Sequence, residues 1–408
     1  MPAPSAAVEP PNRRLQTLMI AQGVSAGGDT MTLTVLTVLA QANGQGTLHV
    51  MLILVASLVP GILLGPKLSF LLSKYTPGTV LKFGLVARAA LIFALMLIPS
   101  FAPALALFFA ATLVSVLETP AILALASANK PADLPGSKLF GRISLARNLG
   151  TIAGPLTAGM LIGLGTPWLA FAIDATTSIA LATAVHLTRI TSKTKPDDRD
   201  SSPARAWQSV ADLIRGGGPA VSALWMLALA ILFTASLPVA QVAFLIGELR
   251  FDPGLYGIVI SCYAAGRLLA SLLGSAVEYP WSQKTLLASA GIVMGISLAG
   301  ASLTTIPALI FLAFFAAGMA NTQQVLSIRT IIHDNVPEER IGTAFTALGA
   351  INNSATLIGV VLGGSLISIL GGKNGLLLAG LCTLAATFVI VLLTQKTRIP
   401  PRTARRTR

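Results

Sequence analysis

Two carboxylates lie in the middle of long apolar runs, where a charged side chain is costly. Asp29 stands in "SAGGDTMTL" and Asp174 in "AFAIDATTS". An ionised side chain near the centre of a membrane helix costs on the order of 3 kcal/mol, so each one needs a reason. Burial favours the protonated carboxylate and a nearby cation favours the ionised one, so an acid that alternates between these environments can load and release a proton. We interpret Asp29 and Asp174 as candidate proton-coupling residues; for Asp29, a hydrogen bond within its own helix is the alternative.

A second group of charges lies at a similar depth in three successive apolar runs. Arg88, Glu118 and Arg147 each fall about two helical turns from the same end of their runs. Mutual pairing would lower the cost of burying them. We interpret them as a structural or gating ion network, with direct substrate contact as the alternative.

Polar side chains in the second half of the chain are candidates for lining a substrate cavity. Arg267 has no acidic partner at its depth, so it is expected to meet an anionic substrate, to meet a carboxylate across the cavity, or to extend to the membrane surface. Amide side chains can hydrogen-bond a substrate without adding charge. Hydrogen bonds between helices, worth about 0.6 kcal/mol each, explain the presence of these amides equally well. The amides are Gln241, Asn321, Gln324, Asn352 and Asn353.

Other kinds of chemistry lack the residues they need. The three histidines and two cysteines do not have metal-ligand spacing, and the sequence has neither a phosphate-binding GxxxxGK[ST] loop nor a nucleophile elbow. We therefore expect no metal, no cofactor and no enzymatic activity.

The elements that position these residues are long apolar helices. The 408 residues are 54% hydrophobic and only 11% charged, with a mean hydropathy of +0.79, which a soluble domain could not cover. Runs of about 20 apolar residues are long enough to cross a membrane. The composition therefore predicts an all-α polytopic membrane protein. Its twelve expected spans are 15–40, 48–72, 80–98, 103–127, 140–164, 167–188, 219–245, 255–277, 284–303, 306–328, 344–370 and 375–394.

The net charge of +13 is distributed unevenly between the two ends of the spans. Alternate loops hold nearly all the basic residues, and the opposite loops hold only Arg250 and Lys373. Because basic loops stay in the cytoplasm, both termini are expected there, and nucleic acid is not needed to explain the charge. The expected organisation is a cytoplasmic tail (1–14), a six-helix bundle (15–188), a linker with an amphipathic helix (189–218), a second six-helix bundle (219–394) and a basic tail (395–408).

An internal repeat supports two related bundles. A shift of 205 positions places Gly154 on Gly359 and Asn148 on Asn353. Small residues at every fourth position let another helix backbone approach closely. One such stripe in each half predicts two pseudo-symmetric bundles around a shared interface, with the substrate site between them near the middle of the membrane.

The small residues of 141–159 also carry a resemblance. Gly141, Gly150, Gly154, Pro155 and Gly159 follow the helix-five motif of export-type carriers in the major facilitator superfamily. With "AQGVSAGGDTMTL", "LVARAALIFAL", "WLAFAIDATTSIA" and "VPEERIGTAFTALGAINNSATLIG", the chain is similar over nearly its full length to the macrolide-efflux-like and enterobactin-exporter-like branch of twelve-helix drug/proton antiporters. This resemblance implies transport by two six-helix bundles, usually as a monomer.

The loop between the second and third spans departs from that family. Its usual glycine and aspartate are replaced by Ser69 and Ser73, followed by Lys74, whereas the second half keeps Gly274 and Glu278. The family's charge-paired latch is therefore missing from this loop, and its loss is the feature that supports a transport-inactive protein as an alternative.

Together these features predict a multi-pass secondary transporter in the cytoplasmic membrane of a bacterium. Its expected work is the export of a small amphipathic organic compound, such as a drug, antibiotic or secreted metabolite, in exchange for protons. The alternatives are a substrate-specific permease for a siderophore or metabolite, and a transport-inactive sensor or scaffold.

Overall fold

The computed structural model describes most of the chain. The described residues are 13–42, 44, 46–64, 71, 74–98, 100–129, 136–188, 228, 229, 231–276, 281–335 and 338–396. Regular secondary structure in these segments is helical throughout. Outside the described residues lie the two tails, the predicted amphipathic helix of 189–218, and positions 69 and 73 of the loop between the second and third predicted spans.

The helices fall into two halves along the sequence. The first half contains α1 (Arg13–Ala42), α2 (Thr47–Val59), the π-helix η1 (Pro60–Leu64), α5 (Pro77–Leu95), α6 (Phe101–Ser115), α7 (Glu118–Ala128), α8 (Gly136–Gly163) and α9 (Trp168–Thr188). The second contains α12 (Leu237–Val242), the π-helix η2 (Ala243–Glu248), α13 (Pro253–Ala276), α14 (Gln283–Ser302), α15 (Pro307–Asn335), α16 (Glu338–Leu370) and α17 (Gly372–Lys396).

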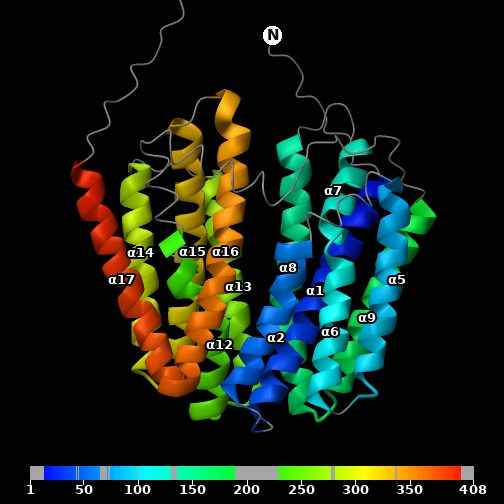
Figure 1. The fold of residues 1–408 in the computed structure, drawn as a ribbon, viewed down its shortest axis with the longest axis horizontal. Helices are drawn as coiled ribbons and strands as arrows, with labels where there is room; N and C mark the ends of the chain where they lie inside the picture. Colours follow the sequence, from blue (N-terminus) through cyan, green and yellow to red (C-terminus); the bar gives the residue numbers. More distant parts are fainter. Residues whose placement is uncertain are drawn as a thin grey trace, which may run out of the picture.

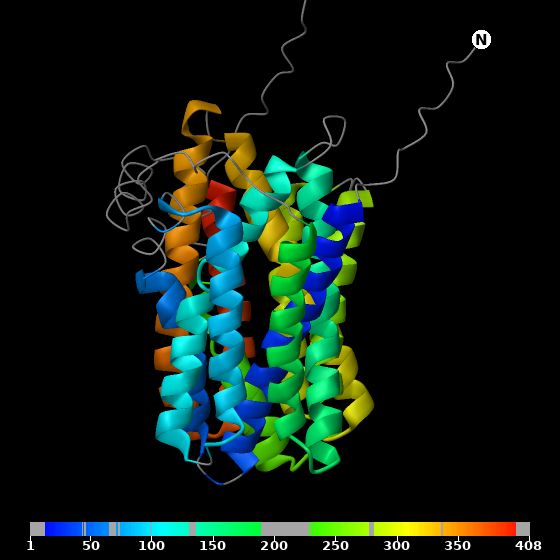
Figure 2. The same ribbon diagram turned by 90° about the vertical axis from the view of Figure 1, so that its right-hand side faces the viewer.

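Ten helical spans of the described chain are long and apolar enough to cross a membrane. α1 and α8 are not among them because they are more polar, but both run through the bundle beside the others (Figure 1, Figure 2). Counting these two, the described part of the chain is consistent with the twelve predicted spans. α1 begins and α17 ends at the same end of the bundle, at the top of Figure 1. We call this the terminal end and the opposite one the distal end.

Prolines explain the helix interruptions that the apolar pattern does not predict. A proline removes one backbone donor and crowds the carbonyl four residues earlier. Pro120 lies just after the break between α6 and α7, and η1 begins at Pro60. The Ala56 carbonyl, which Pro60 leaves without its helical donor, accepts a hydrogen bond from Thr112 Oγ1 at 3.1 Å. The interrupted span is thereby tied to its neighbour.

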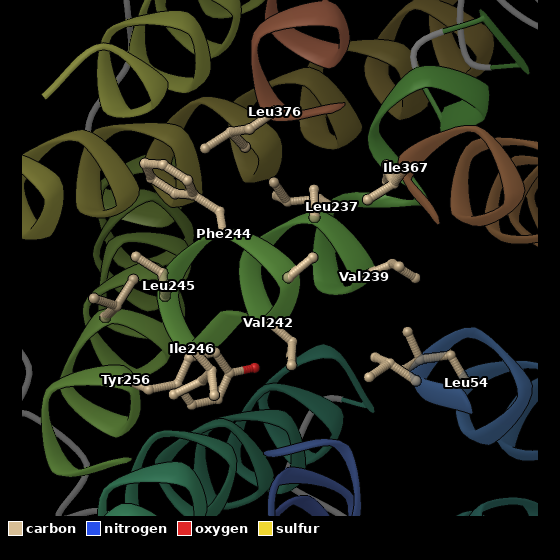
Figure 3. Packing of buried hydrophobic residues seen from close by; sticks show 14 of the residues in the cluster. Leu54, Leu237, Val239, Val242, Phe244, Leu245, Ile246, Tyr256, Ile367 and Leu376 are labelled. Atoms are coloured by element: carbon tan, nitrogen blue, oxygen red, sulfur yellow. The ribbon is translucent and has the colours of Figure 1, made fainter. Parts of the chain in front are cut away.

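Buried side chains join the two halves at the distal end. The largest apolar cluster combines the end of α1 and the start of α2 with α12, η2 and parts of α13 to α17. In Figure 3, Leu54 of α2 points toward Val239 and Val242 of α12. Two other apolar clusters contain residues of the first half alone. The apolar core therefore holds the halves together at the distal end, and the first half has its own core at the terminal end.

α8 forms the seam between α1 and the second half. A Cβ atom at Gly150 would overlap the Gly23 carbonyl of α1, and one at Gly159 would overlap the Pro253 carbonyl at the start of α13. Gly257 of α13 packs in the same way on the Pro155 carbonyl. Gly141 has no neighbour of this kind within 4 Å, so only part of the predicted motif is used for close packing.

Candidate functional site

Close packing of α1 against α9 brings the two predicted aspartates to one place. A Cβ atom at Gly28 would lie 2.7 Å from Asp174 Oδ1 and 2.7 Å from Thr177 Oγ1, closer than real Cβ atoms come. Only a glycine lets α9 approach α1 this closely. Asp29 follows directly in the sequence, so the same contact places its carboxylate beside Asp174.

Arg88 of α5 lies between the two carboxylates. Its Nη2 atom forms ion pairs with Asp29 and with Asp174, in the latter case at 2.9 Å to both carboxylate oxygens. Its Nη1 atom donates to Ser178 Oγ of α9. We call these three charged residues the Asp29–Arg88–Asp174 cluster. One cation faces two acids here, so the cluster carries one negative charge when both acids are ionised.

The two acids of the cluster have different surroundings. Asp174 is fully buried and also accepts a hydrogen bond from Thr32 Oγ1 at 2.6 Å. The Asp29 side chain is 42% exposed, and the structure shows the ion pair with Arg88 for it. Asp174 is therefore a fixed counter-ion for Arg88, whereas Asp29 is the acid that water can reach.

Glu118 and Arg147 extend the cluster toward α7 and α8. Glu118 is buried in the first turn of α7 and interacts electrostatically with all four of the other charged residues, Asp29, Arg88, Arg147 and Asp174. Arg147 is exposed, and its Nη1 atom lies 3.4 Å from Thr119 Oγ1. From the sequence we expect a proton-coupling group and a separate ion network, but the structure joins the two groups through Arg88. The position of a residue along its helix gives its depth in the membrane but not the direction in which its side chain points. Depth alone therefore could not predict that Arg88 pairs with Asp29 and Asp174.

The predicted cavity residues of the second half lie apart from the cluster's described contacts. Gln241 of α12 and Gln324 of α15 are buried, and Asn321 is half-buried. Arg267 of α13 and Asn352 and Asn353 of α16 are exposed, with a 3.2 Å hydrogen bond from Asn352 to Asn353. These residues therefore do not form one hydrogen-bonded group in the described structure.

Sequence reasoning missed two hydroxyl residues that hold the cluster. Thr32 lies three residues after Asp29, and Ser178 lies four residues after Asp174. Residues at these spacings share one face of a helix. A search for hydroxyls one turn from each membrane acid would have found both residues.

Comparisons with known proteins agree with this fold. Residues 223–408 match the sequence profile of the Major Facilitator Superfamily. No match was found among curated protein sequences. Among solved structures, the chain is similar to the nucleoside transporter NupG, with 10% identity, a TM-score of 0.76 and coverage of 94% of this chain and 100% of that one.

Two further solved transporters have comparable likeness. A POT family transporter in complex with 5-aminolevulinic acid has 14% identity and a TM-score of 0.75, over 94% of this chain and 96% of that one. A bacterial homologue of the human lysosomal transporter Spinster, in an inward-facing and occupied conformation, has 14% identity and a TM-score of 0.72, over 96% and 99%. At these identities the likeness establishes the fold. The chain is a polytopic helical membrane protein with the fold of major facilitator transporters.

Proposed function

We propose that the protein is a proton-coupled secondary transporter that exports a small amphipathic organic compound. The observation that carries the proposal is the Asp29–Arg88–Asp174 cluster, a half-exposed acid and a fully buried acid on one buried arginine. The transporter fold and the family match of residues 223–408 support the general class. Export rests on the resemblance of 141–159 to the helix-five motif of drug/proton antiporters.

The cluster allows protonation of Asp29 without leaving a buried charge unpaired. A proton on Asp29 removes one of the two negative charges that face Arg88. Arg88 keeps its ion pair with Asp174, and Thr32 and Ser178 keep both partners in position. Removing a buried charge's last partner is strongly destabilising, and this arrangement avoids that cost. Asp29 is therefore the residue through which we expect proton binding to change helix packing.

The packing of the halves indicates which side the cluster faces. The apolar core joins the halves at the distal end, and the positive-inside rule predicts that the terminal end is cytoplasmic. In this state we expect Asp29 to exchange protons with the cytoplasm. Alternating access then requires the halves to part at the distal end and close at the terminal end, around the α8–α13 seam.

The remaining features of the proposal follow the sequence. We place the protein in a bacterial cytoplasmic membrane with both termini inside, as a non-enzymatic monomer related to the macrolide-efflux-like branch. The solved relatives that carry nucleosides or peptides by name support a second candidate, a permease dedicated to one metabolite.

The test compares wild type with Asp29→Asn in everted membrane vesicles from a host that lacks its own efflux pumps. A pH-sensitive dye reports proton movement while a panel of drugs, dyes and metabolites is added. We expect at least one compound to release protons through wild type and not through Asp29→Asn at equal expression. Asp252→Asn serves as the control, because Asp252 lies in the distal loop and caps the Gly254 amide.

Each other outcome points to a different reading. Proton-coupled transport that persists in Asp29→Asn would remove Asp29 from the coupling mechanism. Transport of one metabolite alone, driven in the uptake direction, would favour the dedicated permease. No movement of any compound would contradict the efflux proposal.

A further inference from the structure

Two arginines outside the cluster lie at the same level on opposite sides of the seam between the halves. Along the seam, Gly159 packs on Pro253, Pro155 on Gly257, and Ser261 Oγ donates to the Ile152 carbonyl at 2.7 Å. α8 and α13 are therefore antiparallel. Counting five residues back from Ile152 in α8 and six onward from Ser261 in α13 leads to Arg147 and Arg267. Both lie about 8 Å from the hydrogen bond toward the terminal end.

The face of α13 that carries Arg267 is the one turned toward the first half. Residues 256, 263 and 267 share a face, since they are spaced by seven and eleven positions. At the distal end of this face, Tyr256 is buried and lies close to Thr37 of α1. Tyr263 is close enough to Arg267 for an electrostatic interaction. The exposed apolar residues Ile258 and Leu269 lie on a different face, as expected for contact with lipid.

Arg147 lies on the corresponding interior face of α8. It shares this face with Gly154 and Ala158, at spacings of seven and eleven residues. Gly154 packs on α1 and Ala158 is fully buried. The exposed Leu149 and Met160 mark the lipid side of α8. The faces that carry Arg147 and Arg267 therefore both lie on the α1 side of the α8–α13 seam, one in each half.

Neither arginine has its charge balanced by an ion pair in the described part of the chain. The ion pairs found there involve Arg88 alone. In the sequence, the only acid between Asp252 and Asp334 is Glu278, which lies outside the described residues. Exposed cations at membrane depth line substrate or ion pathways rather than lipid. The two charges are thus available to a ligand.

We propose that Arg147 and Arg267 form a binding site for the carboxylate of a small amphipathic compound, which bridges the two halves. Two guanidinium groups bear two positive charges, and Glu118, which interacts electrostatically with Arg147, disfavours a highly charged anion there. That balance matches a monoanion rather than a doubly charged phosphate. Arginine binds carboxylates through paired N–H donors, so one carboxylate can engage a guanidinium from each half.

This inference names the substrate class of the proposed transporter, and in that sense it rests on the proposed function. The two arginines nonetheless lie outside the Asp29–Arg88–Asp174 cluster and at a different level along the helices. α1 and α8 run parallel, with Gly27 beside Gly150 and Thr30 beside Gly154. Asp29 therefore lies about 9 Å closer to the distal end than Arg147. The two sites can be tested independently.

The test is an equilibrium titration of purified protein in nanodiscs of uncharged lipid, without a proton gradient. The probes are dansylglycine, which bears a carboxylate, and dansylglycinamide, its neutral counterpart, with dansyl fluorescence as the signal. We expect wild type to bind the carboxylate at least about tenfold more tightly than the amide, as a charge-assisted hydrogen bond predicts. Arg147→Gln and Arg267→Gln should each reduce this preference about fivefold, and the double variant should have none.

Two kinds of variant control the measurement. Arg329→Gln removes an exposed cation of α15 outside the pair and should keep the wild-type preference. Arg147→Lys and Arg267→Lys keep the positive charge and should keep part of the preference for the carboxylate probe. These variants separate loss of charge from misfolding. Equal binding of the two probes to wild type, absence of binding, or an unchanged preference in the double variant would each overturn the proposal. Because no gradient is present, loss of proton coupling would leave this result unchanged.

Discussion

The two halves of the molecule share a glycine contact at equivalent positions. In the first half, Gly154 of α8 packs on the Gly27 carbonyl and Thr30 of α1. In the second, Gly359 of α16 would place a Cβ atom 2.6 Å from the Leu232 carbonyl and 2.8 Å from the Ala235 Cβ. The residues of these two contacts are equivalent, because each pair is 205 positions apart in the sequence: Gly154 and Gly359, Gly27 and Leu232, Thr30 and Ala235. The shared scaffold of the halves is therefore a pair of close helix crossings with the same register.

The halves differ in what the scaffold carries. Thr76 caps α5 by accepting from the Thr79 amide, and Ser282 caps α14 by accepting from the Thr285 amide. Counted from these caps, Arg88 corresponds to Met294, which is fully buried. In the first half, α5 contacts α9 through the Asp29–Arg88–Asp174 cluster. In the second half, α14 contacts α17 through close packing of Gly291 on Thr387 and of Gly295 on Leu384. The first half therefore carries an ion cluster where the second half uses the same helix positions for apolar packing.

Replacing Arg88 with methionine, the residue at the equivalent position of the second half, should produce the largest loss of stability. Arg88→Met leaves Asp174 buried without a counter-charge, which costs about 3–5 kcal/mol when one partner of a buried pair is removed. We expect the thermal midpoint of the purified protein to fall by about 10 °C. Thermal unfolding in detergent, followed by tryptophan fluorescence, measures this change.

A multiple variant separates stability from function at the same place. Arg88→Met combined with Asp174→Ala and Asp29→Asn removes all three charges, so most of the lost stability should return while proton-coupled transport stays absent. An unchanged midpoint in Arg88→Met alone would show that Asp174 does not depend on Arg88.

The next largest effect should come from the glycine crossing, where the halves differ by one methyl group. Gly150 corresponds to Ala355. Gly150→Ala places a methyl group onto the Gly23 carbonyl, and overpacking of this kind costs about 1–3 kcal/mol. The reverse change, Ala355→Gly, should cost no more than about 1 kcal/mol.

Thermal midpoints of the two variants provide the comparison, with Gly141→Ala as the matched control because that position has open space around it. If Gly150→Ala were as stable as Gly141→Ala, the close approach of α1 and α8 would be refuted.

The smallest effect concerns the two seams between the halves. At the α8–α13 seam, Ser261 donates to the Ile152 carbonyl at 2.7 Å, whereas at the α2–α16 seam Ser365 contacts the Met51 sulfur at 3.7 Å. A net hydrogen bond contributes about 0.5–1.5 kcal/mol, and a sulfur acceptor is weaker. Ser261→Ala should therefore lower the thermal midpoint by a few degrees, and Ser365→Ala by less. The opposite order would show that the second seam is the stronger one.

The sequence predicts the helices well because apolar length is a strong signal. The predicted run 284–303 is α14 (283–302) and the predicted run 167–188 is α9 (168–188), each within a residue at either end. Hydropathy does not predict the break in the span 103–127, because it does not register the donor that Pro120 lacks.

The sequence predicts the residues of the site but not their arrangement. Asp29, Arg88 and Asp174 each stand out because a charge in an apolar run is costly. Which acid faces which cation depends on helix rotation and on the glycines that bring α1 against α9. The two seams are set by contacts between residues far apart in the chain, such as Ile152 with Ser261, for which one sequence offers no direct sign.

The polarity of α1 has a consequence for how the protein is made. α1 leaves the ribosome before the other described helices, yet it is not among the helices that are apolar enough by themselves to cross a membrane. The partner that neutralises Asp29 belongs to α5, and the residue that holds this partner belongs to α9. Insertion of α1 alone therefore places an unpaired acid in lipid until both later helices arrive. The first six spans are expected to enter the bilayer as a cooperative group, with α1 held at the membrane's edge or by the insertion machinery until α9 has been synthesised.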